Sequence, residues 1–417
     1  MRQPEANTRL VLARRPGHFE VVTVEHFEVQ HTAVPTLGPG HLLVRSCWLG
    51  MDPAQRGWLR EDSTYVAPVA LGEVMRGSVV GQVVESRDPR IPVGSLVSGF
   101  WGWQQYAVID PAGAVWTVPA ELDRPTSALG LLGTPGLTAY FGMLDLGRPR
   151  PGDHVVVTAA AGATGSVAAQ LAKAAGATVI GVAGGQEKCT WLRETAQLHH
   201  VIDYHVDNLT ESLRQVAPRG VDVVYDNVGG WILDACLESL AVRARVVLGG
   251  AIAARYSTGP EEMRTVTQLP NVMTRRATVH GFLVIDYKDR FDEARSRLLR
   301  LATAGLLATR EDIVTGTLHD APATLQRLFD GANQGKQVLQ IAVPTPPTGP
   351  DLATSLAEAG TQTGTTTGTT TSTTTSTTTS IDTGGGGDLD ARLDAGRDAR
   401  LDAGRDENLD ARAVVAR

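Results

Sequence analysis

The chain has 417 residues, of which 42% are hydrophobic, so it is long and apolar enough for two domains with separate cores. Its formal net charge is −7, but eleven acids and six arginines fall after residue 344, which leaves the rest nearly neutral. A near-neutral body excludes an extended basic surface, so we expect no nucleic-acid partner. No uninterrupted apolar run reaches membrane-spanning length and the N-terminus carries no apolar signal core, so we expect no membrane partner.

The first 130 residues are predicted to form a β-rich, barrel-like domain. Apolar alternation over residues 9–29 is typical of antiparallel strands. Further strands are expected at residues 41–49, 75–85, 91–100 and 101–108, with an ordered loop over 51–58. Residues 128–146 then predict a helical bridge that Pro135 and Gly136 interrupt.

Residues 151–188 predict a strand, a turn, a helix and a second strand, the unit around which the chain is organised. The turn reads Ala160-x-Gly162-x-x-Gly165, which is the dinucleotide fingerprint with Ala in place of the first Gly. Gly162 would let the backbone approach a pyrophosphate, and Gly165 would let the helix pack close to the strand. The N–H groups of the first helical turn would then face the phosphates.

The end of the second strand indicates which dinucleotide is bound. An NAD site places Asp or Glu about twenty residues after the glycines, to bind the ribose 2′-hydroxyl. Here residues 183–188 read AGGQEK, so no acid ends the strand, and Lys188 supplies a positive charge. A 2′-phosphate suits this sequence better than a hydroxyl, and we therefore predict NADP(H).

The alternation of strand and helix continues and predicts a doubly wound parallel sheet, a Rossmann domain, over residues 131–307. Its later strands are expected at residues 201–204, 221–227, 245–248 and 278–285, with a helix at 290–307. Residues 308–343 are expected to return to the first domain. From residue 344 the sequence is rich in Thr, Gly and Ser and repeats ARLDAGRD in tandem, so residues 344–417 are predicted to be a disordered tail.

Several motifs spread from about residue 8 to residue 343 are shared with one known family. They are Met51-Asp52-Pro53, LGEVM at 71–75, GTPGLTAYFG at 133–142, YDNVGG at 225–230 and Asn333 with Gly335-Lys336. In these motifs the sequence resembles the zinc-free medium-chain dehydrogenase/reductases, in the branch of prostaglandin, curcumin and alkenal double-bond reductases. The resemblance implies an α/β fold with a Rossmann sheet and a β-rich GroES-like domain. It also implies a homodimer, paired through the apolar edge strand near residues 279–285.

The family's cofactor residues can be transferred to matching positions of this sequence. The resemblance implies NADP(H) contacts at Gly162, Ala163, Thr164, Gly165, Ser166, Lys188, Tyr204, Asn227, Gly250, Ala251, Ile252, Phe282, Leu283, Val284 and Asn333. Two departures fall near the substrate: Ala54 stands where the family has Tyr after Asp-Pro, and Tyr256 comes one residue later than the family's Tyr.

The sequence predicts no metal site. Zinc-dependent relatives need Cys and His or Glu ligands, but the expected Gly-His-Glu reads Leu71-Gly72-Glu73. The three cysteines, Cys47, Cys189 and Cys236, are scattered and odd in number. They form neither a disulfide framework nor a ligand cluster, which favours a reducing cytoplasm.

The reaction that this resemblance implies is reduction of the C=C bond of α,β-unsaturated ketones or aldehydes. Hydride goes to the β-carbon, and the protein must supply a donor at the carbonyl oxygen and a proton at the α-carbon. Tyr256 and Tyr65 are the first candidates for this donor, ahead of Tyr106 and Tyr140. A zinc-free quinone reductase and a catalytically silent NADPH-binding scaffold remain as alternatives.

Overall fold

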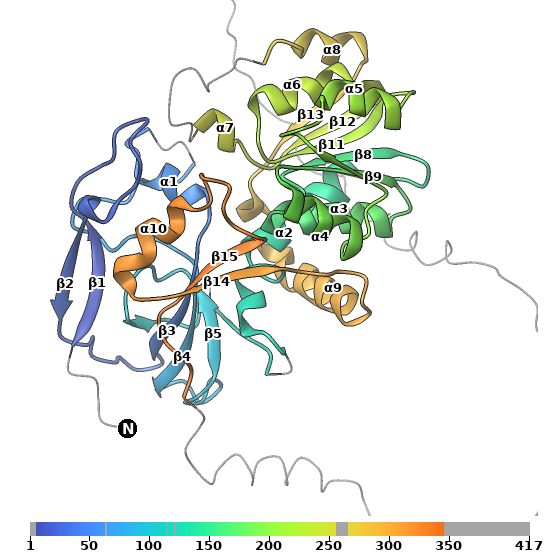
Figure 1. The fold of residues 1–417 in the computed structure, drawn as a ribbon. Coiled ribbons are helices and arrows are strands. Elements are labelled where there is room, and N and C mark those ends of the chain that lie inside the picture. Colours follow the sequence, from blue (N-terminus) through green and yellow to red (C-terminus); the bar gives the residue numbers. More distant parts are fainter. Residues whose placement is uncertain (1–5, 63–64, 114, 121, 256–265, 346–417) are drawn as a thin grey trace, which may run out of the picture. The chain divides into compact units, whose positions relative to one another are not determined.

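The computed structural model describes residues 6–62, 65–113, 115–120, 122–255 and 266–345. It confirms the predicted α/β class, with a parallel Rossmann-type sheet and a separate β-rich part (Figure 1). The tail from residue 346 lies outside the described residues, as does Tyr256. The domain boundaries at residues 130, 307 and 343 stay predictions.

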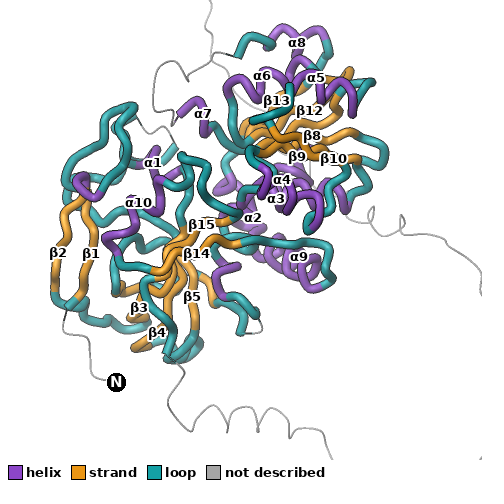
Figure 2. The backbone as a smooth tube through the Cα atoms, in the orientation of Figure 1, coloured by secondary structure: helices purple, strands orange, loops and turns teal. Residues whose placement is uncertain are grey.

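The β-rich part contains a two-stranded hairpin and a seven-stranded sheet (Figure 2). The hairpin pairs β1 (Asn7–Leu12) with β2 (Phe27–Thr32). The sheet has the order β14-β15-β3-β4-β5-β7, with β6 paired to β3. Its strands are β3 (Leu42–Gly50), β4 (Val79–Ser86), β5 (Leu96–Gly99), β6 (Tyr106–Ile109), β7 (Trp116–Thr117), β14 (Glu311–Thr315) and β15 (Lys336–Gln340). Since β15 pairs with β3, the chain returns to its first sheet after the parallel one.

The second sheet has six parallel strands in the order β10-β9-β8-β11-β12-β13. These are β8 (His154–Thr158), β9 (Thr178–Ala183), β10 (His200–Asp203), β11 (Val221–Asp226), β12 (Leu240–Leu248) and β13 (Thr278–Gly281). The direction of winding reverses between β8 and β11. At such a switch point, ligands bind beyond the carboxyl ends of the strands.

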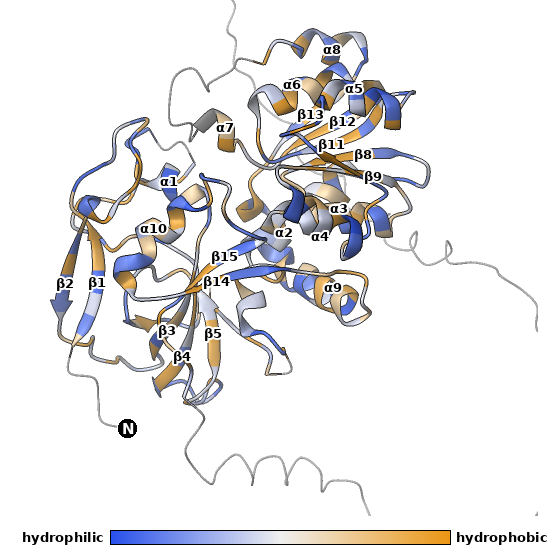
Figure 3. Ribbon diagram, in the orientation of Figure 1, coloured by the Kyte–Doolittle hydropathy of each residue, from blue (hydrophilic) through white to orange (hydrophobic). Residues whose placement is uncertain are grey.

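The parallel sheet is buried on both faces. Val155, Val156 and Val157 are all fully buried in β8, and the hydropathy colouring shows the same apolar character in the central strands (Figure 3). Val155 and Val157 join one hydrophobic cluster and Val156 another, because successive side chains of a strand point to opposite faces. This explains why the strand reads as a continuous apolar run.

Helices cover both faces. The first cluster is completed by α2 (Thr134–Tyr140), α3 (Ala163–Ala174), α4 (Gln186–Glu194) and α9 (Phe291–Thr303), and the second by α5 (Leu209–Val216) and α6 (Gly230–Glu238). The remaining α-helices are α1 (Ala54–Trp58), α7 (Ile252–Arg255), α8 (Leu269–Thr274) and α10 (Ala321–Gln326). Within the described part of the chain, no helix combines the length and the apolar character that crossing a bilayer requires.

Three local predictions were wrong. Residues 51–58 were expected to be a loop but include helix α1. Pro135 was expected to interrupt a helix, yet it lies in the first turn of α2, where a missing N–H costs nothing. The next position requires glycine, because a Cβ on Gly136 would lie 1.7 Å from the carbonyl oxygen of Leu131. The strand at residues 278–285 is also shorter than expected, since a 3-10 helix occupies Val284–Arg290.

Candidate functional site

The turn between β8 and α3 has the close packing that its glycines suggest. Ala159 adopts the left-handed conformation, with φ of 47°, one position before the alanine that replaces the first fingerprint glycine. A Cβ on Gly165 would lie 2.3 Å from the carbonyl oxygen of Ala159, so no side chain fits there. A Cβ on Gly162 would lie 3.2 Å from the same oxygen. The first turn of α3 therefore lies directly against the carboxyl end of β8.

The beginning of α3 is suited to an anion. The first hydrogen bond into this helix runs from the Ser166 N–H to the Gly162 carbonyl, at 3.0 Å. The N–H groups of Ala163, Thr164 and Gly165 consequently have no acceptor within the helix. A helix N-terminus of this kind carries a partial positive charge and binds phosphate.

At the end of β9, Tyr204 lies against Gly184, the first residue of a glycine pair. A Cβ on Gly184 would lie 2.6 Å from the Tyr204 hydroxyl oxygen, so a side chain there would displace the tyrosine from this position. Burial raises the pKa of Tyr204, whose ring also contacts His205 and Trp231 edge-on.

Asp203 is a residue whose role the sequence analysis missed. Its carboxylate accepts hydrogen bonds from the N–H groups of Gly185 (3.0 Å) and His205 (3.1 Å). Burial acts to raise the pKa of Asp203, but these two hydrogen bonds are the largest of several contributions that together outweigh it, so its pKa lies below the ordinary value. Asp203 thus holds the loop after β9 in shape. The signal in the sequence was an acid at the end of β10, next to Tyr204.

Lys188 lies in the first turn of α4 and reaches across to the β-rich part. Its Nζ donates to the carbonyl oxygen of Gly331 at 2.7 Å. Burial lowers the pKa of Lys188. Lys188 thus follows the strand end at which an NAD enzyme would carry its acid, and it contacts the loop that precedes β15.

The carboxyl ends of β8 and β11 are joined by side-chain hydrogen bonds. Asn227 donates through Nδ2 to the carbonyl oxygen of Thr158, and its own N–H donates to the Thr158 hydroxyl, both at 2.8 Å. That hydroxyl donates to Asp226 at 2.7 Å, and Asp226 also accepts from the Gly229 N–H at 2.8 Å. Burial raises the pKa of Asp226. Sequence reasoning found Asn227 but not Thr158 or Asp226, which hold it at the switch point.

The segments expected near the nicotinamide follow the next two strands. The Gly250 N–H donates to the carbonyl of Asp226 at 3.2 Å, and a Cβ on Gly250 would lie 2.7 Å from the Asn227 carbonyl oxygen. Ala251 and Ile252 come next and lead into α7. After β13, the Phe282 ring packs into the core against Gly142, whereas Leu283 is exposed and Val284 is partly buried.

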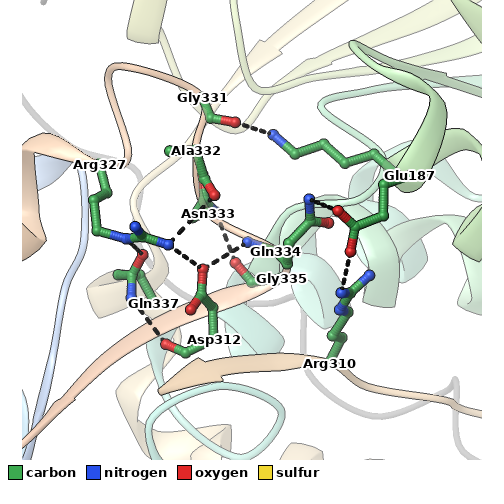
Figure 4. A network of polar contacts seen from close by, with 11 residues as sticks. Glu187, Arg310, Asp312, Arg327, Gly331, Ala332, Asn333, Gln334, Gly335 and Gln337 are labelled. Atoms are coloured by element: carbon green, nitrogen blue, oxygen red, sulfur yellow. Dashed lines mark hydrogen bonds and ion pairs between the residues drawn. The ribbon is translucent and has the colours of Figure 1, made fainter. Parts of the chain in front are cut away.

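The loop before β15 contacts the turn between β8 and α3. Gly335 forms an isolated parallel bridge with Gly162. Asn333 donates through Nδ2 to the carbonyl oxygen of Gly335 at 2.8 Å, and so stabilises this loop (Figure 4). A Cβ on Gly335 would lie 2.1 Å from the Arg310 carbonyl oxygen, and its φ is 78°, so both space and conformation require glycine.

The tyrosine candidates occupy different environments. The Tyr65 side chain is 38% exposed, and its hydroxyl oxygen accepts a hydrogen bond from the Trp58 indole N–H at 3.0 Å. Tyr140 is buried in the core, where its hydroxyl contacts Glu293 at 3.4 Å and burial raises its pKa. Tyr106 begins β6, and Tyr256 lies outside the described residues.

The positions of the zinc-site motif carry other contacts. Glu73 accepts a hydrogen bond from the Ala70 N–H at 3.0 Å and closes a local turn. Among the residues that the structure describes, no group of three or more His, Cys, Asp or Glu side chains is placed to hold a metal ion. Cys47, Cys189 and Cys236 are buried and unpaired.

Comparison with known proteins places this geometry in a family. Residues 8–117 match the model for the N-terminal domain of oxidoreductases, and residues 163–300 match the model for zinc-binding dehydrogenases. The chain is 36% identical over 345 residues to the NADPH-dependent curcumin reductase of Escherichia coli, covering 82% of this chain and 98% of the relative. It is 34% identical over 308 residues to the NADP-dependent 2-alkenal reductase of Nicotiana tabacum, covering 73% and 88%.

Among solved structures, CurA of Vibrio vulnificus in complex with NADPH superposes with a TM-score of 0.74 at 36% identity. The match covers 81% of this chain and 100% of that one. Relatives of this similarity and coverage establish the family. It is the same family that Met51-Asp52-Pro53, the 133–142 stretch and the Asp226-Asn227 strand end resemble. The chain belongs to the zinc-free medium-chain dehydrogenase/reductases and is an NADP-dependent oxidoreductase of the branch that contains curcumin, 2-alkenal and prostaglandin reductases.

Proposed function

We propose that the protein uses NADPH to reduce the C=C bond of α,β-unsaturated ketones and aldehydes. This proposal rests on the residues that follow the end of β9. Tyr204 lies against Gly184 there and Lys188 opens the following helix, with no acid at the strand end, in a chain similar to reductases of curcumin and 2-alkenals. Such compounds present a conjugated C=C bond to the hydride donor.

The residues fit the cofactor. The turn from Gly162 to Ser166 offers helix N–H groups for the pyrophosphate, and Lys188 with Tyr204 would bind the adenosine 2′-phosphate. Asn227, residues 250–252, residues 282–284 and Asn333 would border the remainder of the dinucleotide. When bound, NADPH supplies the hydride.

The protein's own contribution is to stabilise charge and to deliver a proton. Addition of hydride at the β-carbon moves negative charge to the carbonyl oxygen. A tyrosine can donate a hydrogen bond to that oxygen, or give its hydroxyl proton to the α-carbon and take up a new proton from solvent. The contact with Trp58 supports Tyr65 in this role, because the indole N–H donates to the oxygen that would bear charge after proton transfer. Tyr256 is the second candidate, from sequence alone.

We further propose a cytoplasmic homodimer. Strand β13 lies at the edge of the parallel sheet, and Val279 (43% exposed) and Ile285 (57% exposed) lie on or just after it. An apolar edge of this kind is suited to pairing with a second copy across a two-fold axis. Three buried, unpaired cysteines are in keeping with a reducing compartment.

The test is the consumption of NADPH with a panel of enones and enals beside a panel of quinones. Turnover of the enones with saturation of the C=C bond, identified by mass spectrometry, is the expected result. Turnover of quinones alone would replace the proposal by quinone reduction. Tight NADPH binding without turnover on either panel would indicate a silent binding protein.

A further inference from the structure

An acid lies directly beside the lysine that is expected to bind the cofactor phosphate. Glu187 precedes Lys188 in the first turn of α4. A carboxylate in this position would repel a 2′-phosphate, which carries negative charge at neutral pH, and would compete with it for Lys188. The structure shows what offsets this charge.

Both oxygens of Glu187 are engaged by residues of the β-rich part (Figure 4). Arg310 forms an ion pair with Oε1 at 2.6 Å, and Gln334 donates to Oε2 at 3.2 Å. Lys188 contacts neither of these oxygens and donates instead to Gly331. The carboxylate is therefore drawn toward Arg310 and away from its neighbouring lysine.

Arg310 and Gln334 are themselves held in place. The Arg310 carbonyl accepts the Lys336 N–H at 2.9 Å, at the beginning of β15. The Gln334 N–H donates to Asp312 at 3.1 Å, and Asp312 pairs with Arg327 at 2.9 Å. Gln334 is also the direct neighbour of Asn333, one of the residues expected to bind the cofactor.

We propose that Arg310 is a specificity-determining positioning residue for NADPH. It neutralises Glu187 and turns its carboxylate away from Lys188, so that the lysine is available to the 2′-phosphate. NADH has no 2′-phosphate to be repelled, so its binding should not depend on this pair. The inference rests on NADPH binding at Lys188, not on the proposed C=C reduction.

Two other roles for Arg310 give different patterns in a double-mutant cycle. If Arg310 bound the phosphate itself, removing Glu187 would not compensate for its loss. If the pair only fastened two parts of the structure together, removing either partner would weaken both cofactors alike. Under our proposal, the loss of Glu187 is harmless and rescues the loss of Arg310.

The experiment measures dissociation constants of NADPH and NADH by fluorescence titration of the full-length chain, for the wild type, Arg310→Gln, Glu187→Gln and the double variant. Because the pair is partly exposed, we expect Arg310→Gln to weaken NADPH by about three- to fivefold. The NADH constant should stay within about twofold, the range expected when no paired charge is lost. Glu187→Gln should bind NADPH as well as the wild type or better, and the double variant should match it. Arg310→Lys, which keeps the charge, should restore most of the affinity.

Arg214→Gln is the matched control, since Arg214 forms an exposed ion pair with Glu238, also at 2.6 Å, on the helices α5 and α6. It should leave both constants unchanged. A double variant as weak as Arg310→Gln overturns the proposal in favour of a direct phosphate ligand. Equal weakening of NADPH and NADH by both single variants, with a lower melting temperature, overturns it in favour of a purely structural pair. A wild type that binds NADPH but reduces no enone refutes the proposed reaction and leaves this inference standing.

Discussion

Gly162 and Gly335 pair as an isolated parallel β-bridge, although one belongs to the nucleotide turn and the other to the loop before β15. Gly162 caps α3, and Gly335 lies against Arg310 with a positive φ. The bridge brings the turn that we propose binds the phosphates next to the loop that carries Asn333 and Gln334. The proposed cofactor site is consequently built from two parts of the chain that no local pattern connects.

Gly165→Ala is expected to destabilise the protein. Its Cβ would lie 2.3 Å from the Ala159 carbonyl oxygen, so α3 must move away from β8. Overpacking of this kind costs about 1–3 kcal/mol, which thermal unfolding followed by circular dichroism would detect. Gly38→Ala is the control, because a Cβ there makes only an ordinary contact of 3.5 Å with His41. Equal melting temperatures for the two variants would contradict the packing argument.

Lys188→Ala is expected to weaken NADPH selectively. A charge-assisted contact contributes roughly 1.5–3 kcal/mol, so the Michaelis constant for NADPH should rise by on the order of ten- to a hundredfold. The constant for NADH should change little, and Tyr204→Phe should act in the same direction but less. Lys173→Ala is a suitable control, since Lys173 also donates to a backbone carbonyl, that of Ala196. If Lys188→Ala raises the Michaelis constants for NADH and NADPH equally, Lys188 has only a structural role.

Tyr65→Phe is expected to lower kcat for enones by about a hundredfold, the lower end of what general-acid catalysis contributes. Trp58→Phe removes the indole N–H that donates to the Tyr65 hydroxyl and should lower kcat less, with the NADPH dissociation constant unchanged. Tyr106→Phe tests one of the lesser candidates and should leave kcat unchanged. Initial rates of Tyr256→Phe, measured in parallel, decide between the two candidates. If kcat is unchanged in Tyr65→Phe but falls in Tyr256→Phe, the proton donor is Tyr256.

Asp203 is expected to make stability depend on acidity. Its folded-state pKa is lowered, so the ionised form stabilises the fold at neutral pH. That contribution is complete above the ordinary aspartate pKa of about 3.9 and disappears as pH falls below it. Asp203→Asn should lower the melting temperature at pH 7 and flatten its decline in acid. The control is Asp292→Asn, whose side chain is 96% exposed; a parallel decline in Asp203→Asn and the wild type would refute the assignment.

Val279→Lys is expected to dissociate the proposed homodimer. Val279 lies in β13, the edge strand, whose inner neighbour is β12, where Val246 is its partner. A charged side chain at position 279 would oppose pairing of the free edge of β13 with a second copy. Light scattering at micromolar concentration should give a dimer mass for the wild type and a monomer mass for the variant. Val242→Lys, an exposed valine at the opposite end of β12, serves as the control. A monomeric wild type would end the dimer proposal.

The sequence by itself determined most of the secondary-structure elements and the class of cofactor. Apolar runs and helical periodicity predicted the parallel sheet, because burial on both faces imposes a continuous apolar strand. The small residues of the 159–165 turn and the missing acid after β9 indicated NADP(H), since each reflects a local requirement of the ligand or the backbone. The family resemblance then added Asn227 and Asn333 as expected cofactor contacts.

Only the tertiary structure decided which of these residues meet. Asp203 supports Gly185, Thr158 and Asp226 hold Asn227, and Arg310 neutralises Glu187 across a long stretch of chain. These contacts depend on how the chain returns after β13 and on which strand ends become neighbours. Periodicity reports only what happens within a few turns or a single strand, so contacts between distant segments become visible only when the chain is folded.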